Sequence, residues 1–371
     1  MRLISGTAEP WNVRVAIVAP PVASYYGGQE IQAHDLVAIW ENDPQITAAF
    51  VSNRPNLYPS WTRLNKVRYL RTILRFPLYL ANLYQAAHRA EILHVFAASY
   101  GSFLIATAPA ATIGRLLGKK VLIHYHSGWA EDYLGRSILA RRVLRGADLV
   151  VVPSSFLAEV FSRNGIKSIV IPNVVDSQRF QYRQRELFRP RLLCTRNLEQ
   201  HYGVDIVLKA FSIVQQKCPD SHLSLVGSGT ITNQLRELAT NLNLKNVEFK
   251  GAIPPGKMPD VYDQHDVCIN GSRVDCSPVS ILESFCCGLP VVTTAAGGIG
   301  TLVWHEQNGL LSTPGDPEGL AANVLRVLGD QPLARRLAER ARTAVEAHTW
   351  QSLRPLWVQA YASISQNPQI E

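Results

Sequence analysis

The sequence predicts an α/β protein of two domains, each a doubly wound parallel sheet flanked by helices. Short apolar runs typical of buried strands alternate with helical patterns, and the series occurs twice along the 371 residues. A polar and charged stretch at 176–191 separates the two series. We therefore expect domains at 1–185 and 186–345. A last segment, 346–371, is expected to be a helix that packs back on the first domain.

The individual elements follow from these patterns in chain order. In the first half, strands are expected at 13–19, 92–96, 121–125, 149–153 and 169–173, and helices after Gly27-Gly28 and at 102–117, 136–145 and 155–164. In the second half, strands are expected at 191–195, 223–226, 247–249, 267–269, 290–293 and 310–311, and helices at 203–217, 230–242, 256–263, 280–287, 316–328 and within 333–363. Strands that alternate with helices favour parallel sheets, because parallel strands need a long crossover connection.

Several classes of protein are disfavoured by the composition. No run of about 18 apolar residues occurs, so no transmembrane helix is expected. The N-terminal residues lack the apolar core of a signal peptide, which favours the cytoplasm. All six cysteines lie in the second half without a CxxC pair, and buried free thiols are favoured over a redox or metal site. No protein-borne metal site is expected.

The positive charge is concentrated in the first half. Residues 1–185 carry 21 Lys and Arg against 11 Asp and Glu, whereas 186–371 carry 16 against 18. No acid occurs between Asp43 and Glu91, and a helix expected at 62–76 places basic residues beside an apolar face: Arg63, Lys66, Arg68, Arg71 and Arg75. This pattern predicts contact with an anionic membrane surface, with an ordinary solvated helix face as the alternative. Nucleic acid is not expected, because no nucleic-acid-binding motif accompanies the charge.

The segment 270–298 carries the strongest indication of chemistry. It places Asp275 and Glu283 eight residues apart, on either side of an expected helix start that Ser277 or Ser280 would cap. Glu283 is then expected in the first turn of this helix. A helix N-terminus offers free N–H groups and a partial positive charge, which suit a phosphate. An apolar strand and Gly297-Gly298 follow, and the whole predicts a nucleotide-diphosphate pocket.

This segment resembles the donor-site signature of the retaining glycosyltransferases of family 4. That signature is an acidic residue, seven intervening residues, a glutamate, and then a small-residue helix and G-x-P-V-V. Asp275 stands where most of the family has Glu, and the nearer subgroup pattern is D-N-x-P-x-S-I-L-E, with Cys276 in place of its Asn. Three further stretches resemble family motifs: 147–154 (ADLVVVPS), 170–176 (VIPNVVD) and 225–229 (LVGSG). The resemblance spans about 13–345 and implies the GT-B architecture, two Rossmann-like domains that face a cleft.

The resemblance also implies roles in the second domain. Arg196 matches the Arg of the family's G-R-L-x-x-x-K-G and would bind the donor diphosphate, but the Lys is missing and His201 or Tyr202 occupies its approximate place. Glu283 would accept hydrogen bonds from the ribose hydroxyls, and Asp275 would hold the transferred sugar. The remaining implied donor contacts are the turn glycine Gly227 and the backbone N–H groups of Ser280, Ile281 and Leu282. A surface ion pair is the alternative for Arg196.

Two positions are implied in the first domain. Gly28 would bring its N–H to the donor phosphate when the cleft closes, and Gly27 would give the turn its conformational freedom, unless the pair is a plain structural turn. His126 follows the strand at 121–125 and would hydrogen-bond the transferred sugar without acting as a base. A satisfied surface histidine is the alternative.

The sequence thus predicts a retaining, metal-independent glycosyltransferase of the hexosyltransferase type that needs no cofactor. Its partners would be a nucleotide-sugar donor and a lipid-linked or cell-surface glycan acceptor, presented at the inner face of the membrane. A nucleotide-sugar epimerase of the same fold and a non-catalytic GT-B partner subunit are the alternatives. A nicotinamide-dependent enzyme is disfavoured, because the loop after the first strand lacks G-x-G-x-x-G.

Overall fold

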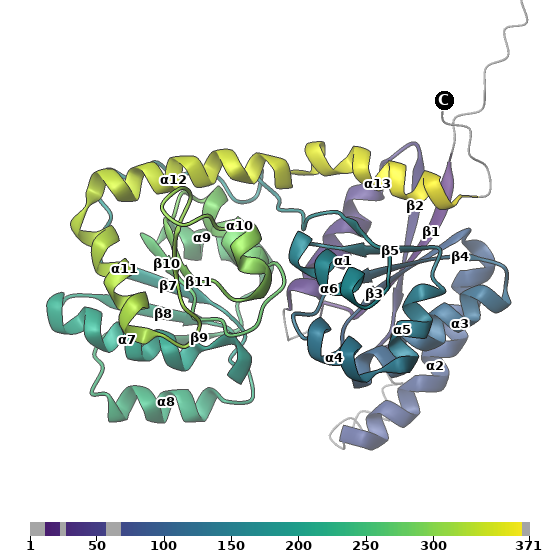
Figure 1. Ribbon diagram of the computed structural model, residues 1–371, viewed down its shortest axis with the longest axis horizontal. Helices are drawn as coiled ribbons and strands as arrows, with labels where there is room; N and C mark the ends of the chain where they lie inside the picture. Colours follow the sequence, from purple (N-terminus) through teal and green to yellow (C-terminus); the bar gives the residue numbers. More distant parts are fainter. Residues whose placement is uncertain (1–11, 23–26, 57–67, 366–371) are drawn as a thin grey trace, which may run out of the picture.

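The computed structural model describes residues 12–22, 27–56 and 68–365, which fold into two parallel six-stranded sheets covered by helices (Figure 1). The strand order is β2-β1-β3-β4-β5-β6 in the first sheet and β12-β11-β10-β7-β8-β9 in the second. Every pairing between these strands is parallel. The predicted α/β class with two doubly wound sheets is confirmed.

The first sheet is assembled from residues 13–170. Its strands are β1 (Val13–Ala19), β2 (Ile46–Ser52), β3 (Ile92–Ala97), β4 (Lys120–Tyr125), β5 (Leu149–Val152) and β6 (Ile169–Val170). Its helices are α1 (Gly28–Trp40), α2 (Arg68–Arg89), α3 (Ala108–Leu116), α4 (Ala130–Arg136), α5 (Ile138–Arg145) and α6 (Ser155–Arg163). Strand β1 is buried at every position except Arg14, as expected for a strand with helices on both faces of its sheet.

The second sheet is assembled from residues 191–312. Its strands are β7 (Arg191–Thr195), β8 (His222–Val226), β9 (Val247–Gly251), β10 (Val267–Ile269), β11 (Val291–Thr294) and β12 (Leu310–Ser312). Its helices are α7 (Val204–Lys217), α8 (Thr232–Asn241), α9 (Met258–Asp263), α10 (Val279–Cys286), α11 (Pro317–Gly329) and α12 (Gln331–Val345). All six strands were predicted, with ends that differ by two residues or fewer.

The helices and strands of the first domain differ more from those predicted from the sequence. Strand β2 was not predicted; it is an edge strand in which only Ile46 and Val51 are buried. The helix expected at 62–76 is α2, which continues past Pro77 to Arg89, while 62–67 lie outside the described residues. The helix expected at 102–117 opens with a π-helical turn at Phe103–Thr107. The helix expected at 136–145 is divided at Ser137, whose hydroxyl accepts from the Ala140 N–H and so caps α5.

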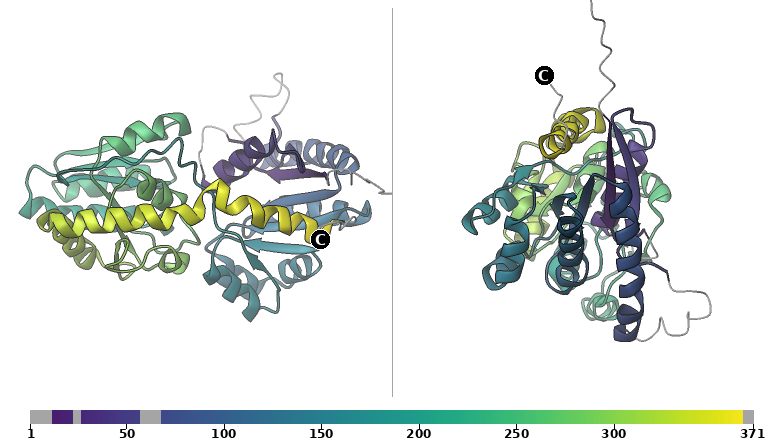
Figure 2. Two further views of the ribbon diagram at one scale, coloured as in Figure 1. Left: turned by 90° about the horizontal axis from the view of Figure 1, so that it is seen from above. Right: turned by 90° about the vertical axis from the view of Figure 1, so that its right-hand side faces the viewer.

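A long helical segment passes from the second domain to the first (Figures 1 and 2). Helix α12 ends at Val345, the chain turns extended at Thr349, and α13 (Trp350–Ile364) continues across the first sheet. Trp357 and Tyr361 belong to the buried core of the first domain. The domain boundaries at 185/186 and 345/346 remain predictions.

Two close approaches join the domains beside the cleft. The Asn173 side-chain amide donates to the Ser277 carbonyl at 2.8 Å. Within the first domain, Gln32 of α1 exchanges hydrogen bonds of 2.7 and 2.8 Å with the backbone of the neighbouring Val174 and so ties α1 to this segment. A Cβ on Gly128 would lie 3.1 Å from the backbone of Asp275, so the loop after β4 presses against the loop that carries this acid.

All six cysteines are free thiols, four of them buried, as the sequence predicted. Within the described ranges, no helix is both long and apolar enough to span a bilayer.

Candidate active site

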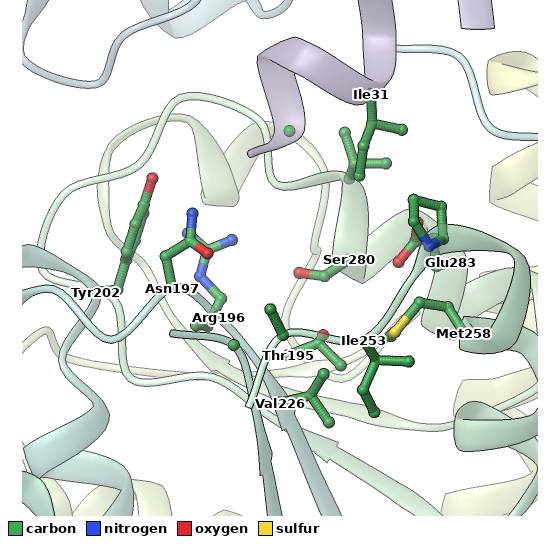
Figure 3. A pocket seen from close by; sticks show the side chains of 15 residues that line it. Ile31, Thr195, Arg196, Asn197, Tyr202, Val226, Ile253, Met258, Ser280 and Glu283 are labelled. Atoms are coloured by element: carbon green, nitrogen blue, oxygen red, sulfur yellow. The ribbon is translucent and has the colours of Figure 1, made fainter. Parts of the chain in front are cut away.

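A cavity opens between the domains at the carboxyl ends of the second sheet's central strands (Figure 3). Strands β7 and β10 are neighbours there. From β7 the sheet continues on one side to β8 and β9, and from β10 it continues on the other side to β11 and β12. Open α/β sheets bind ligands at such a switch in strand order. Helix α1 contributes Gly28 and Ile31. The second domain contributes the other lining residues: Thr195, Arg196, Asn197, Tyr202, Val226, Gly227, Ala252, Ile253, Pro255, Met258, Val279, Ser280 and Glu283.

Two helix N-termini meet across this cavity. Helix α1 begins at Gly28 and helix α10 at Val279, and a Cβ on Gly28 would lie only 3.8 Å from Val279 Cγ2. The first N–H groups of each helix have no partner within the helix, and each N-terminus carries a partial positive charge. The cavity therefore offers a double helix-terminus site for an anion such as a diphosphate.

The start of α10 differs from the prediction. The N-cap is Pro278, without a side-chain cap from Ser277 or Ser280, so Glu283 is the fifth helical residue and lies beyond the first turn. Ser280 lines the cavity, but the Ile281 N–H donates to the Pro278 carbonyl at 3.1 Å. The Ile281 and Leu282 side chains are fully buried in the domain core. The proline in the loop starts the helix earlier than the polar-to-apolar pattern indicated.

Arg196 follows β7 and points its guanidinium into the cavity region (Figure 3). Its Nη2 donates to Asp275 Oδ2, and its Cζ lies 4.1 Å from the ring centroid of Tyr202. Burial alone lowers the pKa of Arg196, but Asp275 and other neighbours outweigh it and leave that pKa raised. The Arg196 Nε is buried and has no hydrogen-bond partner within the described part of the chain. A permanent charge with an unpaired donor suits a diphosphate.

Asp275 lies at the joint between the domains rather than on the cavity wall. Besides Arg196, its carboxylate accepts from the Cys276 N–H at 2.9 Å and from the Ser272 hydroxyl at 3.4 Å. Only 8% of the residue is exposed. Asp275 is therefore placed to orient Arg196 directly, and a sugar would have to compete with Arg196 for its oxygens.

Glu283 is 8% exposed and faces the cavity from α10. Burial raises the pKa of Glu283 to about 7, although the Tyr262 hydroxyl, which donates to Oε2 at 2.6 Å, partly opposes this effect. Tyr262 also hydrogen-bonds the Thr195 hydroxyl at 3.1 Å, so it ties the carboxylate to the end of β7. Sequence reasoning missed Tyr262, because within α9 it looks like one more apolar core residue.

The position of the missing lysine is taken by Tyr202, not His201. Tyr202 lines the cavity and stacks on Arg196, whereas His201 lies outside the lining, with its ring 5.8 Å from that of Trp129. Burial and the charge of Arg196 lower the pKa of His201, so its imidazole is neutral at neutral pH. His201 is thus not a substitute cation in this structure.

The three predicted glycines serve different purposes. Gly227 has a φ of +140°, and a Cβ there would lie 2.1 Å from the Arg196 carbonyl oxygen, so this turn requires glycine. Gly28 opens α1 at the cavity. Gly27 has an ordinary extended conformation, with φ −90° and ψ 154°, so the expected conformational freedom is not used. A side chain at Gly27 would instead collide with the Glu30 carboxylate, 2.1 Å from its Cβ position.

His126 lies at the end of β4, stacked on Phe96 with ring centroids 5.1 Å apart. It does not line the cavity, and its Nε2 is buried without a hydrogen-bond partner among the residues described. Burial lowers the pKa of His126 to about 3, so the ring is neutral. A neutral histidine with an unpaired nitrogen suits the hydrogen-bonding role and not that of an acid.

The basic residues predicted for membrane contact are only partly described. Arg63 and Lys66 lie outside the described residues. Arg68 and Arg71 belong to the first turn of α2, and Arg75 lines a second cavity on the first domain. In the described ranges, no group of three or more His, Cys, Asp and Glu side chains is arranged to hold a metal ion.

Two family models each match a different part of the chain. A model described as Glycosyltransferase Family 4 matches residues 26–179, and one described as Glycosyl transferases group 1 matches residues 178–344. Both domains of the chain are therefore similar to glycosyltransferase domains.

The chain is also similar to named relatives and to solved structures. Glycogen synthase of Mycobacterium tuberculosis is 28% identical over 64% of the chain, which spans 59% of that protein. A GDP-mannose-dependent alpha-(1-6)-phosphatidylinositol monomannoside mannosyltransferase of the same organism is 27% identical over 72% of the chain and 74% of its own length.

The structure of Anabaena Alr3699/HepE with UDP-glucose has a TM-score of 0.76 at 19% identity, covering 95% of this chain and all of that one. Sucrose-phosphate synthase from Thermosynechococcus elongatus has a TM-score of 0.73 at 20% identity, covering 94% and 98%. At these identities the structures establish the GT-B fold.

Proposed function

We propose that this protein is a retaining glycosyltransferase that moves a hexose from a nucleoside-diphosphate donor to an acceptor without a metal ion. One observation carries the proposal: Arg196, Glu283 and the N-termini of α1 and α10 converge on one cavity at a sheet switch point. The relatives' printed names support it, because they are synthases and transferases that act on sugars.

Each part of the cavity has a task in this reaction. The leaving diphosphate gains negative charge as the glycosidic bond breaks, and fixed positive groups that meet this charge lower the barrier. Arg196 and the two helix N-termini supply them, in the place a metal ion takes in other transferases. Glu283, held by Tyr262, accepts hydrogen bonds from the ribose hydroxyls. Asp275 holds Arg196 in place and contributes to the sugar subsite through its remaining lone pairs.

We further propose that the acceptor is a lipid-linked or cell-surface glycan, reached at the cytoplasmic face of the membrane. The start of α2 is rich in arginine, and its apolar Ile73 is 66% exposed. Positive charge beside exposed apolar side chains favours binding to anionic lipid. The relative that acts on a phosphatidylinositol monomannoside supports a lipid-borne acceptor.

Thermal unfolding tests the donor site. Sugars linked to UDP, GDP, ADP and TDP are added to the purified protein in the presence of EDTA, and the donor class that binds raises the unfolding midpoint by several degrees. The shift disappears in Glu283→Ala and persists in Glu237→Ala, an exposed glutamate on α8.

NMR of the sugar released by slow donor hydrolysis then reports the first-formed anomer, which should match the donor. No shift with any donor, or the opposite anomer, contradicts the proposal. Conversion of the donor to its epimer would identify an epimerase instead.

A further inference from the structure

One arginine that does not line the donor cavity lies between helix α1 and the core of the second domain. Arg179 follows the crossing from the first domain to the second, and its backbone N–H donates to Asp176 Oδ1 at 3.0 Å. Its Nη2 lies 3.5 Å from Asp35 Oδ2 on α1, and these two side chains are 26% and 19% exposed. Its Cζ lies 4.9 Å from the ring centroid of Phe180, which is buried in the second domain's core. Arg179 therefore contacts the first domain while its neighbour is anchored in the second.

Helix α1 uses one face for the donor cavity and for this arginine. Gly28 opens α1 at the cavity. Gln32, one turn later, hydrogen-bonds the crossover backbone, and Asp35 in the following turn meets Arg179. Positions four and seven residues along a helix lie on the same face. The helix N-terminus that faces the proposed diphosphate is thus anchored two turns later to Arg179.

The same arginine acts on Glu283 of α10. The Phe180 ring lies 5.7 Å from the Tyr262 ring in an edge-on arrangement, and the Tyr262 hydroxyl donates to Glu283 Oε2 at 2.6 Å. Burial raises the pKa of Glu283 to about 7, the Tyr262 hydrogen bond and the charge of Arg179 lower it, and the charge of Asp35 raises it. Charges act on one another over several ångströms in a buried setting, because little water screens them. Two carboxylates, one from each domain, thus respond to one guanidinium.

The other titratable side chains near Glu283 are thiols. Cys268 lies on β10, Cys286 ends α10, and Cys287 follows it. Burial raises the pKa of each of these thiols, so none of them carries a charge at neutral pH. The ionic environment of Glu283 is therefore set by Arg179 and Asp35.

Arg179 has hydrogen-bonding capacity that the described residues do not use. Its Nε is buried and has no hydrogen-bond partner in the described ranges. The 3.5 Å between Arg179 Nη2 and Asp35 Oδ2 exceeds the roughly 2.7–2.9 Å of a strong charged hydrogen bond. Asp35 therefore does not saturate the guanidinium, whose charge remains available to a second carboxylate.

We propose that Arg179 is a positioning residue of the donor site, a single cation whose charge is shared between Asp35 on α1 and Glu283 on α10. Arg179 favours the ionised form of Glu283, which offers both oxygens to the ribose hydroxyls, whereas a protonated carboxyl would turn one oxygen into a donor. Asp35 opposes this effect and limits it. The inference rests on the proposed donor site, but the coupling of the charges can be measured without a donor.

Carbon-13 NMR of the full chain, labelled at the glutamate side-chain carboxyls, tests this coupling. The Glu283 signal is the one lost in Glu283→Gln, and its titration midpoint is followed without ligand. Arg179→Gln should raise the midpoint by about one pH unit and Asp35→Asn should lower it by a similar amount, because the first removes an opposite charge and the second a like charge. Arg179→Lys should stay near wild type. Arg183→Gln, four residues along the same segment and 49% exposed at its side chain, is the matched control and should leave the midpoint unchanged.

Binding of a nucleoside diphosphate then tests the positioning role. UDP, GDP and ADP all carry the ribose diol, and each is titrated calorimetrically into the protein at pH 7 and pH 9. For the nucleotide that binds wild type, Arg179→Gln should weaken binding about fivefold at pH 7, as a one-unit shift from about 7 requires. Binding at pH 9 should be nearly equal, because Glu283 is then ionised in both proteins.

The outcomes separate this inference from the donor function. An unchanged midpoint in Arg179→Gln, or shifts of the same sign in Arg179→Gln and Asp35→Asn, overturns the shared charge. A midpoint that does not fall in Asp35→Asn overturns it even where Arg179→Gln does not fold. Equal weakening of nucleotide binding at both pH values overturns the positioning role and indicates loosened packing. If no nucleotide binds wild type, the donor function fails, while opposite midpoint shifts still support the action of Arg179 on Glu283.

Discussion

The two domains build their sides of the cleft in different ways. The second domain gathers its site from short sequence motifs at the ends of β7, β8 and β10, and its central ion pair, Arg196 with Asp275, is buried, with side chains 10% and 8% exposed. The first domain contributes a helix N-terminus and a cavity whose ion pair, Arg54 with Glu30, is looser, with Arg54 56% exposed. The buried pair holds Arg196 in one geometry, whereas the exposed Arg54 side chain is free to change its conformation.

Replacing the arginine of each pair tests this difference in rigidity most strongly. Arg196→Gln should lower the free energy of unfolding by about 3–5 kcal/mol, because it leaves the Asp275 carboxylate buried and unpaired. Arg54→Gln should cost about 1 kcal/mol or less, since its pair is exposed to water. Urea unfolding measures both. The double variant Arg196→Gln/Asp275→Asn should regain part of the loss, and equal costs for the two single variants would remove the distinction.

Glu283→Ala should reduce sugar transfer by about 1,000-fold while Glu237→Ala leaves it unchanged. Two hydrogen bonds from hydroxyls to a carboxylate are lost, at about 2 kcal/mol each. Initial rates under subsaturating donor report the change, and retained turnover would contradict the assignment of Glu283 to the ribose.

The raised pKa of Glu283 gives stability a pH dependence that Glu283→Gln removes. Below about pH 4.5 the carboxyl is protonated in both folded and unfolded chains, and between there and pH 7 the unfolded chain ionises first, so stability falls. The loss is about 3 kcal/mol, from a shift between 4.5 and about 7. Urea unfolding at pH 5 and pH 8 should therefore show Glu283→Gln gaining stability relative to wild type at the higher pH. A constant difference would place Glu283 in a more solvated setting.

The smallest expected effect concerns the membrane. Changing Arg68 and Arg71 to Gln should weaken binding to anionic vesicles by about 2 kcal/mol, because each basic residue near the surface contributes about 1 kcal/mol. Flotation with vesicles rich in phosphatidylserine measures it, with Arg335→Gln/Arg336→Gln on α12 as the matched control in the second domain. Equal flotation of both variants would place membrane contact, if any, outside α2.

The predictability of the two domains differs for a physical reason. Five strands of the second sheet are mostly buried, so their apolar runs mark them in the sequence. The sixth, edge strand β9, is only half-buried but was found as well. Edge strand β2, in which only Ile46 and Val51 are buried, was missed. Helix α2 was placed too early, because a proline at position 77 normally ends a helical pattern, yet here the helix continues through it.

Much of the candidate site was also predictable. Arg196, Glu283, Gly227, Ser280 and Gly28 all line the cavity, because they belong to local strand–turn–helix motifs whose geometry the chain sets over a few residues. Ile281, Leu282 and His201 do not line it, and Tyr202 does. Neighbouring residues of one turn point in different directions, so Ser280 lines the cavity and Ile281 does not. The family pattern, whose lysine is missing here, does not tell whether His201 or Tyr202 faces the cavity.

The sequence by itself determined the two doubly wound sheets, because burial periodicity and turn chemistry act over short distances. Only the tertiary structure decided which groups meet. Arg196 and Asp275 are 79 residues apart in the sequence, and Tyr262 of α9 reaches Glu283 of α10. Glu30 of α1 lies 3.9 Å from Arg54, which follows β2. Such pairings depend on how parallel strands bring their carboxyl ends to one edge and how the domains close on each other, and no local pattern records either.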